Sequence, residues 1–83
     1  MPNAAASSEM NVFVAAVDAG GFSAAARLLD LTPSAVSKQI SRLEERLGAR
    51  LLNRSTRRIS LTDAGREFYE RSRAILADID EAE

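Results

Sequence analysis

The sequence predicts a mostly α-helical fold with one small β-hairpin, and three observations support this prediction. Apolar residues recur at helical spacing in four segments that are separated by glycine or Thr-Pro breaks. Two of the resulting helices, at 23–29 and 33–47, leave only residues 30–31 for a turn, which is typical of a helix-turn-helix. Two short β-type runs, 51–54 and 59–62, follow. The fold class is therefore a winged helix-turn-helix with a small two-stranded wing and a long C-terminal dimerisation (linker) helix.

The first predicted helix begins near Ser7 or Ser8, since a serine hydroxyl can cap a helix N-terminus. One apolar stripe at i, i+3, i+4 and i+7 consists of Met10, Phe13, Val14 and Val17. The pair Gly20-Gly21 ends this helix, because glycine adopts the left-handed conformation at little cost.

The second predicted helix is capped by Ser23 and runs to about Leu29. Its alanines allow another backbone to approach closely, and Leu28 and Leu29 are expected to supply the apolar contact. On its own, this segment is most simply interpreted as an alanine-rich core helix.

The third helix has the clearest start signal, a threonine N-cap followed by proline at the first helical position, and Gly48 ends it. Its inner face, at 3.6-residue spacing, consists of Val36, Ile40, Leu43 and Leu47. Its outer face consists of Ser34, Lys38, Ser41, Arg42 and Glu45, with Ala35 and Ser37 on the two flanks.

The last helix, about 63–80, is capped by Thr62 and carries an apolar seam with steps of about 4, 3 and 4 residues. The seam consists of Phe68, Ser72, Ile75 and Ile79, with Tyr69 and Leu76 alongside. A domain of this size cannot cover so long a stripe, so we expect a homodimer through this helix; packing on its own domain is the alternative. Residues 1–62 are then the winged domain and 63–83 the dimerisation helix.

Composition excludes several function classes. The chain has no cysteine and no histidine, which removes thiolate and imidazole chemistry, so no metal, cofactor or catalytic residue is expected. An enzyme would depend on carboxylates, yet these resemble a solvated helix surface: Asp63, Glu67, Glu70, Asp78 and Glu81. There is no apolar run of membrane-spanning length and no signal peptide, so we expect no membrane contact and a cytoplasmic location.

Charge is concentrated in the middle of the chain. Residues 38–58 hold seven basic and two acidic side chains, a net of +5, whereas 1–37 carry −2 and 59–83 carry −4. Such a basic segment between acidic ends is typical of a localised anion-binding surface. The alternative on charge alone is a solvated helix face with scattered arginines.

The third helix has the residue types that a major-groove reader needs near its N-terminus. Small side chains let its backbone approach base edges, and Lys38 can donate to guanine. The expected base-proximal residues are Ser34, Ala35, Ser37 and Lys38. Gln39 lies toward the buried flank and is interpreted as a helix-packing residue.

Other residues are expected to contact the DNA backbone or the minor groove. Ser23 and Thr32 stand at helix N-termini, where backbone amides can meet phosphates. Arg42 and Arg54 suit phosphates, while Arg57 or Arg58 at the wing tip can enter an A·T-rich minor groove. A protein-interaction module with a basic face for an acidic partner remains the alternative from another class.

Three segments, 20–29, 31–48 and 51–65, resemble in order and spacing the N-terminal domain of LysR-type transcriptional regulators. They read GGFSAAARLL, LTPSAVSKQISRLEERLG and LLNRSTRRISLTDAG, and the resemblance extends from about Met10 to Ile79. It implies a homodimeric bacterial regulator that binds an interrupted palindrome in double-stranded DNA through paired linker helices. It also implies that an effector-binding domain is absent from this chain, so that a small-molecule inducer is not bound by this fragment.

The resemblance implies individual roles as well. Pro33, Ser34, Ser37 and Lys38 would lie near the bases, Arg57 at the minor groove, and the phosphate contacts would come from Thr32, Arg42 and Arg54. Two residues depart from the family pattern. Many members have glutamine where Pro33 stands. Lys38 replaces a frequent arginine, which keeps the positive charge but loses the planar guanidinium group and its paired donors.

Overall fold

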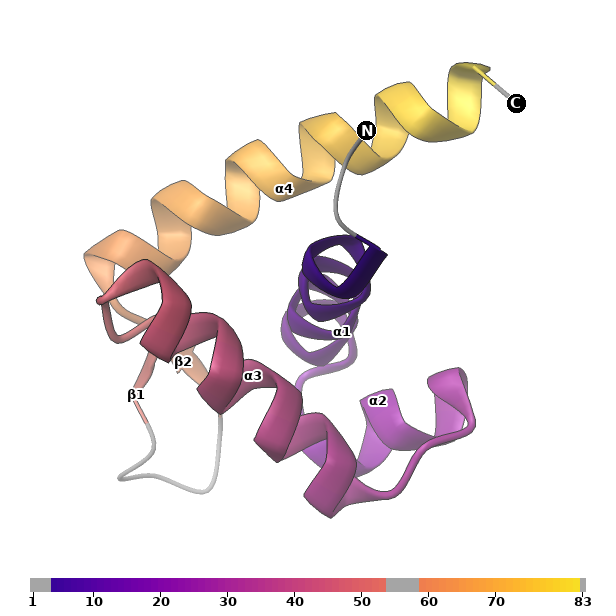
Figure 1. Cartoon of the computed structure of the whole chain (residues 1–83). Helices are drawn as coiled ribbons and strands as arrows, with labels where there is room; N and C mark the ends of the chain where they lie inside the picture. The colour runs from indigo at the N-terminus through magenta and orange to yellow at the C-terminus, as the bar shows by residue number, and fades with distance from the viewer. Residues whose placement is uncertain (1–3, 54–58, 83) are drawn as a thin grey trace.

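Three helices form the body of the domain, and a hairpin and a fourth helix follow them (Figure 1). The computed structural model describes residues 4–53 and 59–82. Its elements are α1 (Ala4–Ala19), α2 (Phe22–Leu29), α3 (Pro33–Leu47), β1 (Leu52–Asn53), β2 (Ser60–Leu61) and α4 (Asp63–Ala82). The predicted helix-turn-helix with a small two-stranded sheet and a long last helix is confirmed.

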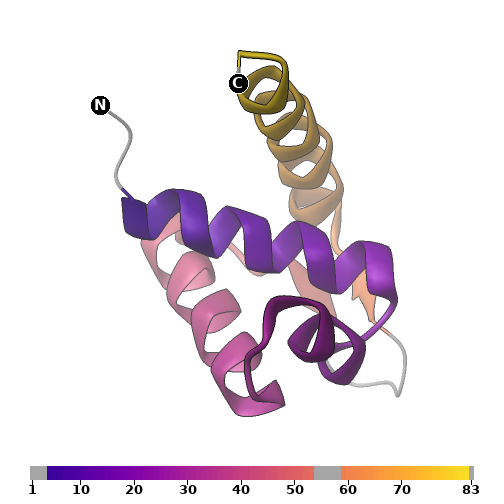
Figure 2. The same ribbon diagram turned by 90° about the vertical axis from the view of Figure 1, so that its right-hand side faces the viewer.

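Helix α1 contacts all three other helices and lies across α2 and α3 (Figure 2). The buried core comes from α1, α2, α3 and the chain that enters β1, and it consists of Val12, Phe13, Ala16, Ala25, Ala26, Val36, Ile40, Leu43, Leu51 and Leu52. The predicted inner face of α3 supplies Val36, Ile40 and Leu43 to this core, but the predicted stripe of α1 is only partly right. Phe13 is buried, whereas Met10, Val14 and Val17 are partly buried and the other core residues of α1 are Val12 and Ala16.

Two predicted core residues lie on the surface instead. Leu28 is 73% exposed and Leu47 is 40% exposed. In α2 the buried positions are Ala25 and Ala26, and a residue two places after Ala26 points about 200° away from it at 100° per residue. The apolar contact of α2 therefore comes from Leu29, which packs against the core.

Helix ends follow largely from left-handed residues. Gly20 and Gly48 have φ values of 80° and 67°, which confirms the two predicted glycine stops. Helix α2 ends at Asp30, with φ 57°, and the Leu31 amide then donates to the Ala26 carbonyl over 2.9 Å. This closing bond keeps the turn of the helix-turn-helix short.

Two predicted helix starts are wrong. Helix α1 begins at Ala4, so Ser7 and Ser8 lie inside it, because the alanines that precede them favour helix and extend it. Helix α2 has Gly21 as its N-cap without a side-chain cap bond, and Ser23 is its second residue. Glycine is itself an accepted N-cap residue, which explains why the helix starts before the serine.

The two paired strands of the wing are shorter than the predicted β-type runs 51–54 and 59–62. Strands β1 and β2 are antiparallel and pair Leu52 with Leu61 and Asn53 with Ser60. The first pair faces the domain interior, whereas the second is exposed, with the Asn53 amide nitrogen 3.3 Å from the Ser60 hydroxyl. The predicted wing tip, 54–58, lies outside the described residues.

Thr62 joins the wing to α4. Its hydroxyl accepts from the Gly65 amide over 3.0 Å, which confirms the predicted cap, and donates to the Arg50 carbonyl over 2.5 Å. The Thr62 amide donates to the Leu51 carbonyl over 3.0 Å. Gly65 is buried so close to this chain that an added Cβ would stand 2.0 Å from the Leu51 carbonyl oxygen. The start of α4 is therefore held against the entry to β1.

Candidate nucleic-acid interface

The start of α3 has the geometry that its sequence predicts. The Thr32 hydroxyl accepts from the Ala35 amide over 3.1 Å, and Pro33 occupies the first turn. The Thr32 carbonyl also accepts from the Val36 amide over 3.1 Å. Thr32, Pro33 and Ser34 are all exposed. The first turn of α3 is thus rigidly capped and open to a ligand.

The outward face of α3 is a stripe of small and basic side chains above a buried face. Lys38 and Arg42 are exposed, while Ala35 and Ser37 are partly buried on the flanks, as predicted. Within the described residues, neither Lys38 nor Arg42 forms an ion pair. Directly beneath this stripe, three side chains are fully buried: Val36, Ile40 and Leu43. The two cations are therefore presented on a helix whose position is fixed by the core.

Ser23 is exposed in the first turn of α2, although it is not the N-cap. Its predicted phosphate contact stays a prediction. Arg54, Arg57 and Arg58, the predicted wing contacts, lie outside the described residues.

Two polar contacts hold α1 against α3. The Arg46 guanidinium is 2.6 Å from the Glu9 carboxylate, and the Ser8 hydroxyl is 3.5 Å from the Gln39 side-chain oxygen. Gln39 is partly buried, in agreement with its interpretation as a packing residue. Arg46 is therefore a structural arginine, and the basic segment presents fewer free cations than its sequence charge indicates.

Glu44 is the polar residue whose role the sequence reasoning missed. Its side chain is buried, with the residue 8% exposed, although acidic residues are seldom buried without partners. One carboxylate oxygen accepts from the Leu51 amide over 2.8 Å and from the Leu52 amide over 3.2 Å. The helical spacing from Ile40 to Glu44 is the signal that places this carboxylate on the inner face.

The predicted seam of α4 is divided between two environments. Phe68 packs on Phe13 of α1, with ring centroids 5.7 Å apart, and Ser72 is only 1% exposed. The assignment of Ser72 to a dimer interface is therefore wrong, because the chain's own fold covers it. Its hydroxyl has no hydrogen-bond partner among the described residues.

Tyr69 contacts its own domain as well. Its hydroxyl donates to the Asp18 carboxylate of α1, and the Arg73 guanidinium lies 5.7 Å from the ring centroid. The hydrogen bond to Asp18 raises the pKa of Tyr69 above its ordinary value of 10.0, with smaller contributions from burial and from the Asp18 charge, and Arg73 opposes the rise. The partly buried Phe68 and Tyr69 thus fix the first half of α4 to α1, and their additional place in a dimer interface stays a prediction.

The second half of the seam is uncovered. Ile75 is 46% exposed and Ile79 is 41% exposed, and Leu76 is partly buried. Figures 1 and 2 show α4 extending beyond the three-helix body. Within the described part of α4, the exposed large apolar side chains therefore lie in this half of the helix.

Two negative findings concern the described part of the chain. It holds no group of three or more acidic residues, histidines or cysteines arranged to bind a metal ion. None of its helices is both long and apolar enough to cross a membrane.

Comparison with known proteins agrees with this geometry. The family model described as bacterial regulatory helix-turn-helix protein, lysR family, matches residues 7–66. The HTH-type transcriptional regulator CrgA of Neisseria meningitidis is 48% identical over 77 residues, which cover 93% of this chain and 26% of CrgA. The chain thus spans about a quarter of the length of that relative.

Solved structures are similar as well. The complex of the BenM DNA-binding domain with benA site 1 DNA gives a TM-score of 0.89 at 34% identity, over 92% of this chain and 85% of that one. The CbnR DNA-binding domain in its DNA complex gives a TM-score of 0.85 at 37% identity, over 92% and 87% of the two chains.

Proposed function

This chain belongs to the LysR family of bacterial regulatory helix-turn-helix proteins, and from this premise we propose that it binds a specific sequence in double-stranded DNA. Similar domains have been solved as DNA complexes, which supports the proposal. The chain is the helix-turn-helix domain of a transcription regulator and not an enzyme, since its relatives are HTH-type regulators. Its work on bacterial DNA would be done in the cytoplasm.

One observation carries the proposal: the first two turns of α3, which are capped by Thr32, expose small side chains and one cation on a helix held by the core. Pro33 and Ser34 leave room for the backbone to approach base edges, and Lys38 reaches beyond them. An α-helix fits the major groove of B-form DNA, where lysine can donate to guanine O6 and N7. We assign base readout to Ser34, Ala35, Ser37 and Lys38.

Contacts to the DNA backbone would set the orientation of α3. Exposed Arg42 lies one turn after Lys38, and Thr32 and Ser23 lie at the start of α3 and α2. We assign these three residues, together with Arg54, to phosphates. Arg57 and Arg58 of the sequence-predicted wing tip are assigned to the minor groove, whose negative potential attracts arginine.

Pro33 reduces the number of direct base contacts that this domain can make. Proline has neither a side-chain donor nor an acceptor, so it offers no bidentate contact to adenine at the position where many family members have glutamine. Lys38 acts as a single flexible charge rather than a planar fork. The sequence preference is therefore expected to depend on few direct base contacts and more on DNA shape.

We further propose a homodimer on an interrupted palindrome, with residues 1–62 as the DNA-binding unit and 63–83 as the pairing helix. The exposed second half of the α4 seam supports this, because Ile75 and Ile79 leave apolar surface in water. Two-fold pairing of α4 would place two copies of α3 on the two half-sites.

Selection of duplexes from a random pool, followed by fluorescence anisotropy titration at several salt concentrations, tests the proposal. Affinity should fall steeply with salt, because each neutralised phosphate releases counterions. A pool without enrichment, or salt-insensitive binding, would overturn it. In a competition experiment, an acidic polypeptide is added to the protein–DNA complex at an equal concentration of negative charge. Displacement of the DNA by this polypeptide would favour the alternative, a module that binds an acidic protein.

A further inference from the structure

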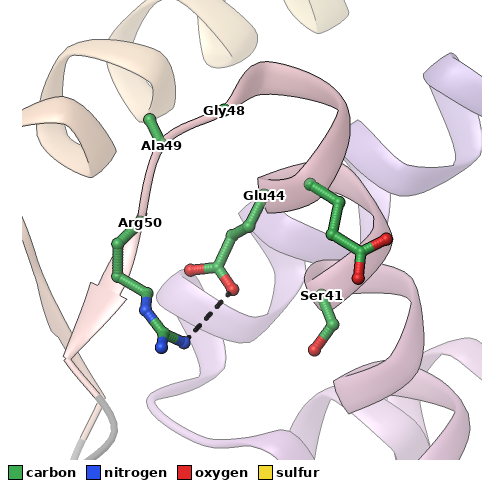
Figure 3. A pocket seen from close by; sticks show the side chains of 6 residues that line it. Ser41, Glu44, Gly48, Ala49 and Arg50 are labelled. Atoms are coloured by element: carbon green, nitrogen blue, oxygen red, sulfur yellow. Dashed lines mark ion pairs between the residues drawn. The ribbon is translucent and has the colours of Figure 1, made fainter.

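Glu44 links the inner side of α3 to the start of the wing. The residue is 8% exposed, and Figure 3 shows its side chain directed from α3 toward the segment that leads into β1. A single carboxylate oxygen accepts from two consecutive amides, those of Leu51 at 2.8 Å and Leu52 at 3.2 Å. The other oxygen is 3.9 Å from the Arg50 guanidinium.

The amides that Glu44 satisfies have little access to water. Leu51 and Leu52 are each 1% exposed, and a buried backbone amide without a partner is costly. The same short segment is held on its carbonyl side by Thr62, which bonds to the carbonyls of Arg50 and Leu51. Residues 50–52 therefore lie between one carboxylate from α3 and one residue at the start of α4.

We propose that Glu44 is a positioning residue for DNA recognition: it fixes the direction in which the wing leaves α3. The inference deepens the proposed function and rests on it. If α3 reads the major groove and the wing reaches the adjacent minor groove, the two contacts must be spaced to match one duplex. A bond from the recognition helix to the first residues of the wing sets that spacing without touching DNA.

Chemistry favours a carboxylate at this position. It is an acceptor without a donor, so it can receive two amides from one side and a cation from the other. Glutamine has nearly the same shape but only one acceptor oxygen, which is neutral. With this oxygen toward the two amides, the bonds to them lose the strengthening that a charged acceptor gives, and the NH₂ group faces Arg50; in the other orientation the amide bonds are lost, so Glu44→Gln weakens the hold on Leu51 and Leu52 either way. The charge change alone would act in the opposite direction, because removing a negative charge near DNA strengthens binding.

A double-mutant cycle with Arg57→Ala on the selected duplex tests the proposal, with Glu45→Gln as the matched control. Glu45 is the exposed neighbour of Glu44, so its variant makes the same charge change without a buried partner. Glu44→Gln should weaken binding on the order of tenfold, the loss expected for one positioned contact, while Glu45→Gln binds at least as tightly as wild type. The doubly substituted protein should bind no more weakly than Arg57→Ala alone.

Amide hydrogen exchange without DNA separates the inference from the proposed function. Glu44→Gln should lose protection at Leu51 and Leu52 while the amides of α3 keep theirs. Additive effects in the cycle, or unchanged protection at these two amides, would overturn the positioning role. If Glu44→Gln loses this protection but the wild-type domain binds no DNA, the proposed function is refuted, and the role of Glu44 in recognition with it. If Glu44→Gln does not fold, Glu44→Asp, which keeps the charge but shortens the reach, replaces it with the same expected losses.

Discussion

Replacing Gly65 by alanine should destabilise the fold strongly, although the same change on an exposed helix would stabilise it. An alanine Cβ at this position would stand 2.0 Å from the Leu51 carbonyl oxygen and 2.9 Å from its carbonyl carbon. Ordinary contacts between carbon atoms are about 3.5–4.0 Å. The neighbour is backbone, so no side-chain rotation can relieve the overlap, and the start of α4 must move away from the entry to β1.

The size of the effect follows from three competing contributions. Helix propensity favours alanine over glycine by about 1 kcal/mol. Overpacking of a close contact costs about 1–3 kcal/mol, and more when backbone must shift. The shift also strains three hydrogen bonds that Thr62 makes to Arg50, Leu51 and Gly65, each contributing about 1 kcal/mol. A net loss of about 2–4 kcal/mol is expected, which lowers Tm by roughly 10–30 °C for a domain of this size.

Thermal and urea unfolding, followed by circular dichroism at one protein concentration, measures this loss. Gly21→Ala is the matched control, because nothing lies within 4 Å of its added Cβ and its φ of 177° suits any residue. The control should unfold within about 1 kcal/mol of wild type. A Gly65→Ala variant as stable as wild type, or more stable, would show that helix propensity outweighs the contact and would refute the reasoning.

Three further predictions concern α4. Serine at both Ile75 and Ile79 should raise the dimer dissociation constant about 30-fold or more in sedimentation equilibrium, because both copies lose apolar burial, and an unchanged constant would contradict the proposed interface. Tyr69, the only tyrosine of the chain, should titrate by ultraviolet absorbance above 10.0 in the folded protein, since its hydroxyl donates to Asp18. Because the pKa of Tyr69 is higher in the folded than in the unfolded protein, the group contributes to stability. This contribution is complete below the pKa of the unfolded state and is lost as pH rises through the pKa of the folded state. Tyr69→Phe should therefore lose less stability than wild type above about pH 10, and an equal loss would contradict this. Ser72→Ala should be neutral or stabilising by up to about 1 kcal/mol in urea unfolding, because it removes a buried hydroxyl without a partner in the described structure, whereas a clear loss would indicate a bond not accounted for.

Local backbone chemistry made much of this fold predictable. The threonine cap and proline at the start of α3, and the left-handed Gly20 and Gly48 at helix ends, act within a few residues of themselves. The outward face of α3 could be predicted equally well, because 3.6-residue spacing assigns Lys38 and the buried Val36 to different sides of the helix.

The features that could not be predicted depend on contacts with another segment of the chain, which the local sequence does not show. Glu44 is a charged residue whose burial makes sense only once the Leu51 and Leu52 amides lie against it. Gly65 has no local reason to be glycine, since its constraint is a carbonyl of the preceding segment.

The α4 seam shows the same limit in another form. Its spacing predicts one continuous apolar stripe but does not say which part the chain's own domain covers. Packing of Phe68 on Phe13 decides this, and it leaves Ile75 and Ile79 as the exposed remainder.

The central claim is that the first two turns of α3 read DNA bases, and a base-substitution scan of the selected duplex tests it most directly. Wild type and Lys38→Ala are compared at every position of the site, with Glu45→Gln as a control outside these two turns. Lys38→Ala should lose about 1–3 kcal/mol of discrimination at one base pair in each half-site and keep its preferences elsewhere. An identical scan for wild type and Lys38→Ala, or a uniform loss at all positions, would contradict base readout by α3.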